Sequence, residues 1–150
     1  METTEKKSVK VLNDLVVINN DRIEGYERAA KETEDADLKQ LFSSMANESH
    51  KHKAELLAEV VGLDGEPAEG TTTSGKIYRA WMDVKAALSG KDRKAILASC
   101  EFGEDAALEV YKEALESDEL SVSGRSLVSK QKDLIQSSHD KIKAMRDSAK

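Results

Sequence analysis

The chain carries its apolar residues in four long stripes that recur every three to four positions, as amphipathic α-helices do. One stripe consists of Leu12, Val16, Asn19, Ile23, Tyr26 and Ala30. The stripes predict long helices at about residues 8–33, 36–61, 92–116 and 124–147, the first with Ser8 as its N-cap. At 1.5 Å per residue the first helix would be about 39 Å long, which is typical of a helix bundle.

The predicted connections differ in length. Short turns join the first helix to the second and the third to the fourth, so each pair is expected to form an antiparallel hairpin. Residues 62–91 lie between the pairs and contain a further amphipathic helix at about 75–88, with Trp81 on its apolar face. This connection is long enough to cross the bundle from end to end. The sequence therefore predicts an all-α four-helix bundle with one long crossover, folded as a single domain over residues 1–150.

Two of the predicted helices share a short repeat. The segment IEGYERAA at 23–30 matches LEVYKEAL at 108–115, with a tyrosine at the same place in each. The match indicates either a duplicated helical hairpin or a coincidence between two alanine-rich helices.

Composition narrows the function classes. Aromatic residues make up 4% of the chain, charged residues 35%, and there is one proline, which favours helix over sheet. The net charge of −6 argues against a nucleic-acid partner. No apolar run is long enough to span a membrane, and no secretion signal precedes the first helix, so a cytoplasmic location is expected. The single cysteine, Cys100, lies on a core stripe and is interpreted as a small buried hydrophobe.

Polar residues interrupt every stripe where apolar ones are expected. They are Asn19, Glu48, His52, Glu104 and His139. Burying a polar group without a partner costs about 1–3 kcal/mol, so these residues need a reason to be there. Inward-facing glutamates and histidines on facing helices are how bundles hold metal ions. A buried polar network is the other interpretation, and the residues alone leave both open.

Three segments give the chain a family resemblance. They are NNDRIEGYERAA at 19–30, YRAWMDVKAAL at 78–88 and CEFGEDAALEVY at 100–111. The chain resembles the ferritin-like superfamily of rubrerythrins and bacterioferritins. Within it, the chain is most similar to a family of small bacterial four-helix-bundle proteins of unknown function. The resemblance implies a ferritin-like topology and an association with stress responses.

The resemblance also implies a ligand set, of which this chain keeps a part. Rubrerythrin-like enzymes place a ligand glutamate seven residues before a core tyrosine, as Glu104 stands before Tyr111. In the first predicted helix the same rule leads to Asn19, which is not a carboxylate.

The Glu-x-x-His motifs of the other two helices are each half present. In the second predicted helix Glu48 keeps the glutamate, but Lys51 replaces the histidine. In the fourth, His139 keeps the histidine, but Gln136 replaces the carboxylate.

The predicted metal ligands are therefore Glu48, His52, Glu104 and His139, with Glu27 and Glu101 as additions. The set is too small for a symmetric di-iron cluster, so the sequence favours a non-catalytic structural or interaction protein with a degenerate metal site. No catalytic residue and no cofactor are assigned. The alternative is an oxidase or peroxidase-type protein that uses this set to bind iron or another divalent metal.

Partners are only weakly indicated by the sequence. The apolar face around Trp81 either covers the bundle or binds a protein partner, whose identity the sequence does not reveal. Homodimerisation through a flat face of the bundle also stays open.

Overall fold

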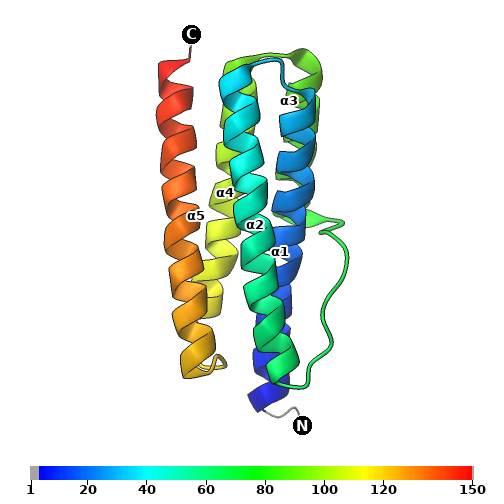
Figure 1. Ribbon diagram of the computed structural model, residues 1–150, viewed down its shortest axis with the longest axis vertical. Helices are drawn as coiled ribbons and strands as arrows, with labels where there is room; N and C mark the ends of the chain where they lie inside the picture. Colours follow the sequence, from blue (N-terminus) through cyan, green and yellow to red (C-terminus); the bar gives the residue numbers. More distant parts are fainter. Residues whose placement is uncertain (1–3, 150) are drawn as a thin grey trace.

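The protein is a bundle of long helices (Figure 1). The computed structural model describes residues 4–149. The helices are α1 (Thr4–Glu32), α2 (Ala36–Gly62), α3 (Gly75–Gly90), α4 (Arg93–Glu116) and α5 (Val122–Ser148). The described part of the chain contains no strand. This confirms the predicted all-α class, and the predicted short helix at 75–88 corresponds to α3.

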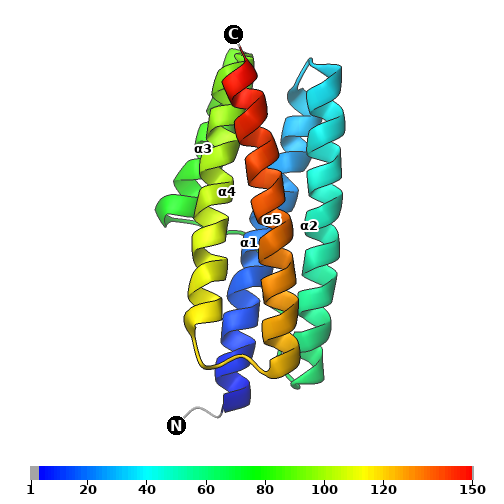
Figure 2. The same ribbon diagram turned by 90° about the vertical axis from the view of Figure 1, so that its left-hand side faces the viewer.

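The directions of the helices confirm the long crossover. In Figure 1, α1 rises from the N-terminal end of the bundle and α2 descends beside it. The chain then climbs along the outside, forms α3, and turns into α4, which descends parallel to α2 before α5 rises again. The pairs α1–α2 and α4–α5 are thus antiparallel hairpins, as predicted. Figure 2 shows α3 outside the bundle, alongside α4.

Side-chain N-caps form at the starts of α4 and α5, whereas Asp35 and Ser74, which precede α2 and α3, accept no capping hydrogen bond. The Asp92 carboxylate accepts a hydrogen bond from the backbone N–H of Ala95 (3.2 Å), and the Ser121 hydroxyl accepts one from Gly124 (3.0 Å). The prediction that Ser8 caps the first helix is wrong. Helix α1 already begins at Thr4, because the intervening Glu5, Lys6 and Lys7 are good helix formers, and Ser8 is buried within the helix.

The interior runs the length of the bundle in two apolar clusters. One cluster includes Tyr26, Phe42 and Leu97 and lies where α3 covers the bundle, and the other includes Leu12, Leu56 and Ile135. The predicted stripes face this interior almost throughout, but Leu134 of the last stripe is exposed. None of the helices within residues 4–149 has an apolar stretch long enough to cross a membrane.

The apolar face of α3 covers the bundle. Val84 and Leu88 are buried in it, and the indole of Trp81 lies against α1 and α4 at two glycines. A Cβ at Gly25 would overlap the Trp81 ring, and one at Gly103 would touch it at 3.4 Å. The absence of a side chain at Gly25 is therefore what lets the tryptophan-bearing α3 approach α1 so closely. Of the two alternatives for this face, the structure shows the covering one.

Polar side chains of α1 bind the connection that precedes α3. Asn13 donates to the carbonyl of Glu66 (2.8 Å) and accepts from the N–H of Ala68 (3.0 Å). Asn20 donates to the carbonyl of Gly70 (2.8 Å). The Asp21 carboxylate accepts from both the N–H and the hydroxyl of Thr72 (2.9 and 2.5 Å). This segment is therefore fixed along the outside of α1 by side-chain hydrogen bonds.

Candidate functional site

The centre of the bundle contains a fully buried arginine that the sequence analysis did not single out. The guanidinium of Arg22 donates from Nε to Glu104 Oε2 (3.0 Å) and from Nη2 to Glu104 Oε1 (2.9 Å). Its Nη2 also lies 3.5 Å from Glu48 Oε1. Both Arg22 and Glu104 have no exposed side-chain surface. Two of the predicted metal ligands thus lie beside a cation that belongs to the protein itself.

The sequence of α1 explains how the arginine reaches the interior. Arg22 lies three residues after Asn19 and four before Tyr26, which places all three on the buried face of the helix. The guanidinium carbon lies 5.7 Å from the centre of the Tyr26 ring, within the range of a cation–π contact. The position of Arg22, between Asn19 and Tyr26 on the buried face, was the signal in the sequence that could have predicted it.

A second series of hydrogen bonds in the interior links the four helices α1, α4, α5 and α2. Asn19 donates from Nδ2 to the Tyr111 hydroxyl (2.8 Å), and that hydroxyl donates to Gln131 Oε1 (2.7 Å). Gln131 in turn donates from Nε2 to the backbone carbonyl of His52 (3.1 Å). Asn19 therefore has a structural partner at the place where the resemblance implies a carboxylate.

The two tyrosines of the sequence repeat occupy related places. Asn19, seven residues before Tyr26, contacts Tyr111. Glu104, seven residues before Tyr111, lies close enough to Tyr26 to raise its pKa, although burial of the hydroxyl is the larger cause. The Tyr26 hydroxyl has no hydrogen-bond partner among the described residues, so the relation of the α1–α2 and α4–α5 hairpins by duplication stays a prediction.

Electrostatics favour a charged Arg22 and a neutral His52. Burial acts to lower the pKa of Arg22, but Glu104 and the neighbouring groups outweigh it, and the pKa lies above its ordinary value. Burial, followed by the charge of Arg22, lowers the pKa of His52 to about 3. Burial raises the pKa of Glu48, although the nearby guanidinium opposes the shift. His52 is therefore uncharged at neutral pH.

The hydrogen bonding of this interior is incomplete within the protein. Both ring nitrogens of His52, Nη1 of Arg22 and Oδ1 of Asn19 are buried without a hydrogen-bond partner among residues 4–149. His52 Nε2 lies 4.0 Å from Glu48 Oε1, which is beyond hydrogen-bonding distance. Glu48, His52 and Glu104 therefore lie near one guanidinium but do not form a compact ligand set.

The fourth predicted ligand lies elsewhere. His139 of α5 has its Nε2 2.7 Å from Asp105 Oδ1 and 3.6 Å from Glu101 Oε1, both on α4. Glu101, Asp105 and His139 thus form a group whose potential ligand atoms all lie within 4.8 Å of one another. Within residues 4–149 it is the one such group of three or more potential ligands. Asp105 was not among the predicted ligands, although it lies one helical turn after Glu101.

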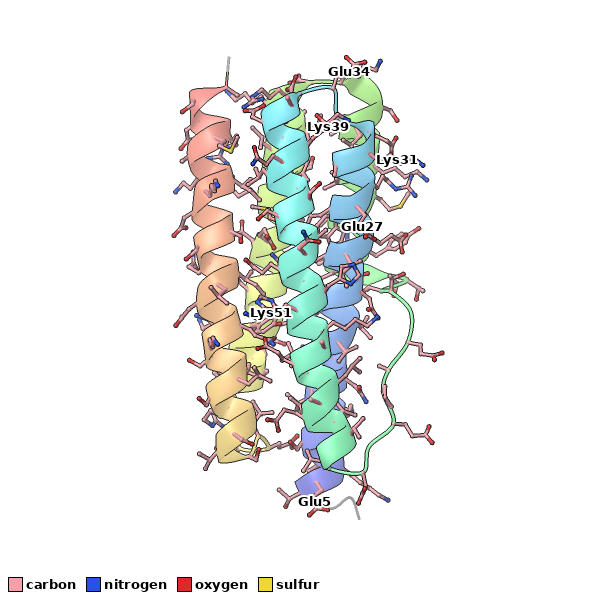
Figure 3. The ribbon with its side chains drawn as sticks, in the orientation of Figure 1. Glu5, Glu27, Lys31, Glu34, Lys39 and Lys51 are labelled. Carbon is pink, nitrogen blue, oxygen red and sulfur yellow. The ribbon has the colours of Figure 1, made fainter. Side chains whose placement is uncertain are left out.

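Glu27 lies on the outside of the bundle. Its side chain is 59% exposed and pairs with His50 of α2, with 3.4 Å between His50 Nε2 and Glu27 Oε2. Figure 3 shows Glu27 on α1 and Lys51 on α2, and both side chains are exposed. The inward rotation of Glu27 that would supply the missing carboxylate is not seen. The six predicted ligands are thus divided among the interior, the α4–α5 surface and the α1–α2 surface.

Chemically, the interior arrangement balances charge. Both oxygens of Glu104 accept from one guanidinium, a bidentate geometry that fixes the carboxylate in place. An ion that bound Glu104 would have to displace Arg22 from a site that offers the guanidinium no solvent. Cys100 is fully buried beside this region, and burial raises the pKa of its thiol, which agrees with its interpretation as a buried hydrophobe.

Comparison with known proteins identifies a family but no activity. A search of curated proteins finds no significant match. A family model matches residues 7–117, which run from α1 to the end of α4. This confirms that the chain belongs to an uncharacterised family, while membership of the wider ferritin-like superfamily stays a prediction. The chain is a member of the family described as a domain of unknown function, DUF2383.

Proposed function

We propose that this protein is a non-catalytic helical bundle with a structural or interaction role, in which Arg22 supplies the interior positive charge that a metal would supply in a ferritin-like enzyme. The observation that supports this most directly is the bidentate contact between Arg22 and Glu104, both fully buried. The contact engages the carboxylate that the resemblance makes the best-matched ligand.

Energetics favour the arginine over an ion at this place. Removing one member of a buried ion pair costs about 3–5 kcal/mol, because the other charge stays buried without a partner. A metal that bound Glu104 would leave the charge of Arg22 buried without its partner, and the free energy of metal binding would have to offset this cost. Of the six predicted ligands, Glu48 and the neutral His52 are the two that lie near Glu104 to help hold the metal. Two irons bridged by carboxylates need more donors than this interior offers.

The alternative function is a metal-binding oxidase or peroxidase-type protein that uses Glu48, His52, Glu104 and His139 with iron. It requires His139 to leave Asp105 and Arg22 to leave Glu104. We therefore rank this function second.

One experiment separates the two functions. The metal-stripped full chain is loaded with Fe(II) without oxygen, the bound iron is counted, and oxygen uptake is followed after mixing with air. We expect no oxygen uptake above that of free Fe(II) in the same buffer. Two irons per chain together with oxygen uptake, both lost in Glu104→Gln, would establish the oxidase instead. The assay is repeated in Asp105→Asn, so that iron at the α4–α5 surface is not counted as interior iron.

The remaining functional predictions rest on the resemblance and the composition. They are an association with stress responses, a cytoplasmic location, homodimerisation, and the lack of nucleic-acid and membrane partners. Because the apolar face of α3 is used to cover the bundle, any protein partner would bind the outer surface. Gel filtration with light scattering tests the homodimer.

A further inference from the structure

The boundary between α4 and α5 contains a mixed cluster of two carboxylates and an imidazole. Glu101 and Asp105 lie one turn apart on α4, and His139 faces them from α5. The Glu101 and His139 side chains are only 11% and 12% exposed, and Asp105 at 53% opens the cluster to solvent. The cluster is thus nearly buried at Glu101 and His139 and open to solvent at Asp105.

The imidazole of His139 is oriented by a carboxylate outside the cluster. Its Nδ1 lies 3.1 Å from Oδ1 of Asp140. A carboxylate oxygen only accepts hydrogen bonds, so Nδ1 is the donor in this contact, as Nε2 is toward Asp105 when no ion is bound. Gln136 donates to the same oxygen (3.0 Å) and holds it in place. A histidine whose far nitrogen donates to a carboxylate is the usual arrangement of a metal-ligating histidine, and here it directs Nε2 toward Glu101 and Asp105.

Charge at this boundary is also unbalanced. Glu101, Asp105 and Asp140 contribute three carboxylates around one imidazole, and the fixed cation in contact with them is Arg146. Arg146 pairs with Oε2 of Glu101, which leaves Oε1 facing His139. The three carboxylates thus carry two more negative charges than Arg146 offsets, beside a nearly buried site. This excess of negative charge favours a bound cation.

We propose that Glu101, Asp105 and His139 form a binding site for one divalent first-row transition-metal ion, with Zn²⁺ as the reference ion. One imidazole and two carboxylates suit such ions better than Ca²⁺ or Mg²⁺, which prefer oxygen ligands alone. Three protein ligands leave a position for water on the solvent side, at Asp105. The site goes beyond the proposed function, because it uses neither Arg22 nor Glu104.

The donor distances require little movement. Two donors each about 2.1 Å from a tetrahedral ion are about 3.4 Å apart. The 3.6 Å between His139 Nε2 and Glu101 Oε1 is close to this value, and Asp105 Oδ1, now 2.7 Å from Nε2, has to move outward. Asp105 is the most exposed of the three, so it is the side chain best able to move.

Calorimetric titration of the metal-stripped full chain with Zn²⁺ tests the site, with Co²⁺ titration followed by visible absorption as a second measurement. We expect one ion per chain and no comparable binding of Mg²⁺ or Ca²⁺. His139→Ala should weaken binding at least about 100-fold, and Asp105→Asn at least about tenfold. Asp140→Asn, which removes the orienting carboxylate, should weaken binding about 10–100-fold.

Two variants serve as matched controls. His50→Ala removes an exposed histidine that also faces a carboxylate, and Glu104→Gln alters the interior. Both should keep the wild-type affinity, with folding of every variant checked by circular dichroism. Absence of saturable binding, or binding that persists in His139→Ala, would refute the site. Binding lost in Glu104→Gln would instead place the ion in the interior and would count against the proposed function.

Discussion

The ion pair between Arg22 and Glu104 yields the most direct quantitative prediction. Arg22→Met removes the charge but keeps most of the alkyl length, and it leaves the Glu104 carboxylate buried without its bidentate partner. Glu104→Leu conversely leaves the Arg22 guanidinium buried without its carboxylate partner. Each single substitution should lower the free energy of unfolding by about 3–5 kcal/mol, out of a total of about 5–15 kcal/mol.

The double variant separates the interaction from the cost of burial. In Arg22→Met with Glu104→Leu, neither charge remains, and apolar side chains of similar size fill the space. Replacing a complete buried pair in this way is often neutral. We therefore expect the double variant to be more stable than either single variant, with a coupling free energy of at least about 3 kcal/mol.

Urea unfolding followed by far-ultraviolet circular dichroism measures all four proteins. The control cycle is the exposed pair Arg28–Glu32, whose charged atoms lie 3.6 Å apart one turn along α1. Its coupling should be about 0.3–0.5 kcal/mol. If the Arg22 and Glu104 substitutions add to within about 1 kcal/mol, the guanidinium does not hold the interior together as argued.

Three further predictions test the interior, the close approach of α3 and the crossover. His52 has a pKa of about 3 when folded and about 6.5 when unfolded, so the unfolded state binds a proton that the folded state does not. The free energy of unfolding should fall by about 1.4 kcal/mol per pH unit as the pH drops below about 6.5. In His52→Leu, the dependence of this free energy on pH, measured by urea unfolding at each pH, should be smaller by the contribution of one proton. Gly25→Ala should cost about 1–3 kcal/mol by displacing the indole, whereas Gly103→Ala should be neutral or slightly stabilising, as thermal unfolding would show. Asp21→Ala should speed proteolytic cleavage near Thr72, because it removes both hydrogen bonds that Asp21 accepts from Thr72, and unchanged cleavage would contradict that role of Asp21.

The fold could be predicted from the sequence because it depends on periodicity and connection length. Stripes at three- and four-residue steps locate the long helices, and the length of residues 62–91 determines that α2 and α4 run parallel. The start of α1 was misplaced at Ser8, since a serine that is a good N-cap is also small enough to be buried within a helix.

The site could be predicted only in part, because a stripe shows which residues face inward but not which of them meet. Glu48, His52 and Glu104 do lie around one place, yet the group between them is Arg22, which was not among the predicted interior residues because a long charged side chain on a stripe usually extends to solvent. His139 lies on the edge of its stripe, and a rotation of α5 by a fraction of a turn decides whether it meets Glu104 or Asp105. Periodicity alone does not fix that rotation, since packing against α4 does.

The proposed role of Arg22 in place of an ion has a functional consequence that follows from chemistry alone. A metal between carboxylates can leave, accept electrons or bind oxygen, and its presence depends on supply. The Arg22 guanidinium can do none of these, because it is covalently part of α1 and its raised pKa keeps it charged at any physiological pH. The interior charge balance of this bundle is thus independent of metal, and any response of the protein to metal has to arise outside it. The α4–α5 boundary meets that requirement, because Asp105 opens it to solvent and Arg146 pairs with Oε2 of Glu101, which leaves Oε1 facing His139.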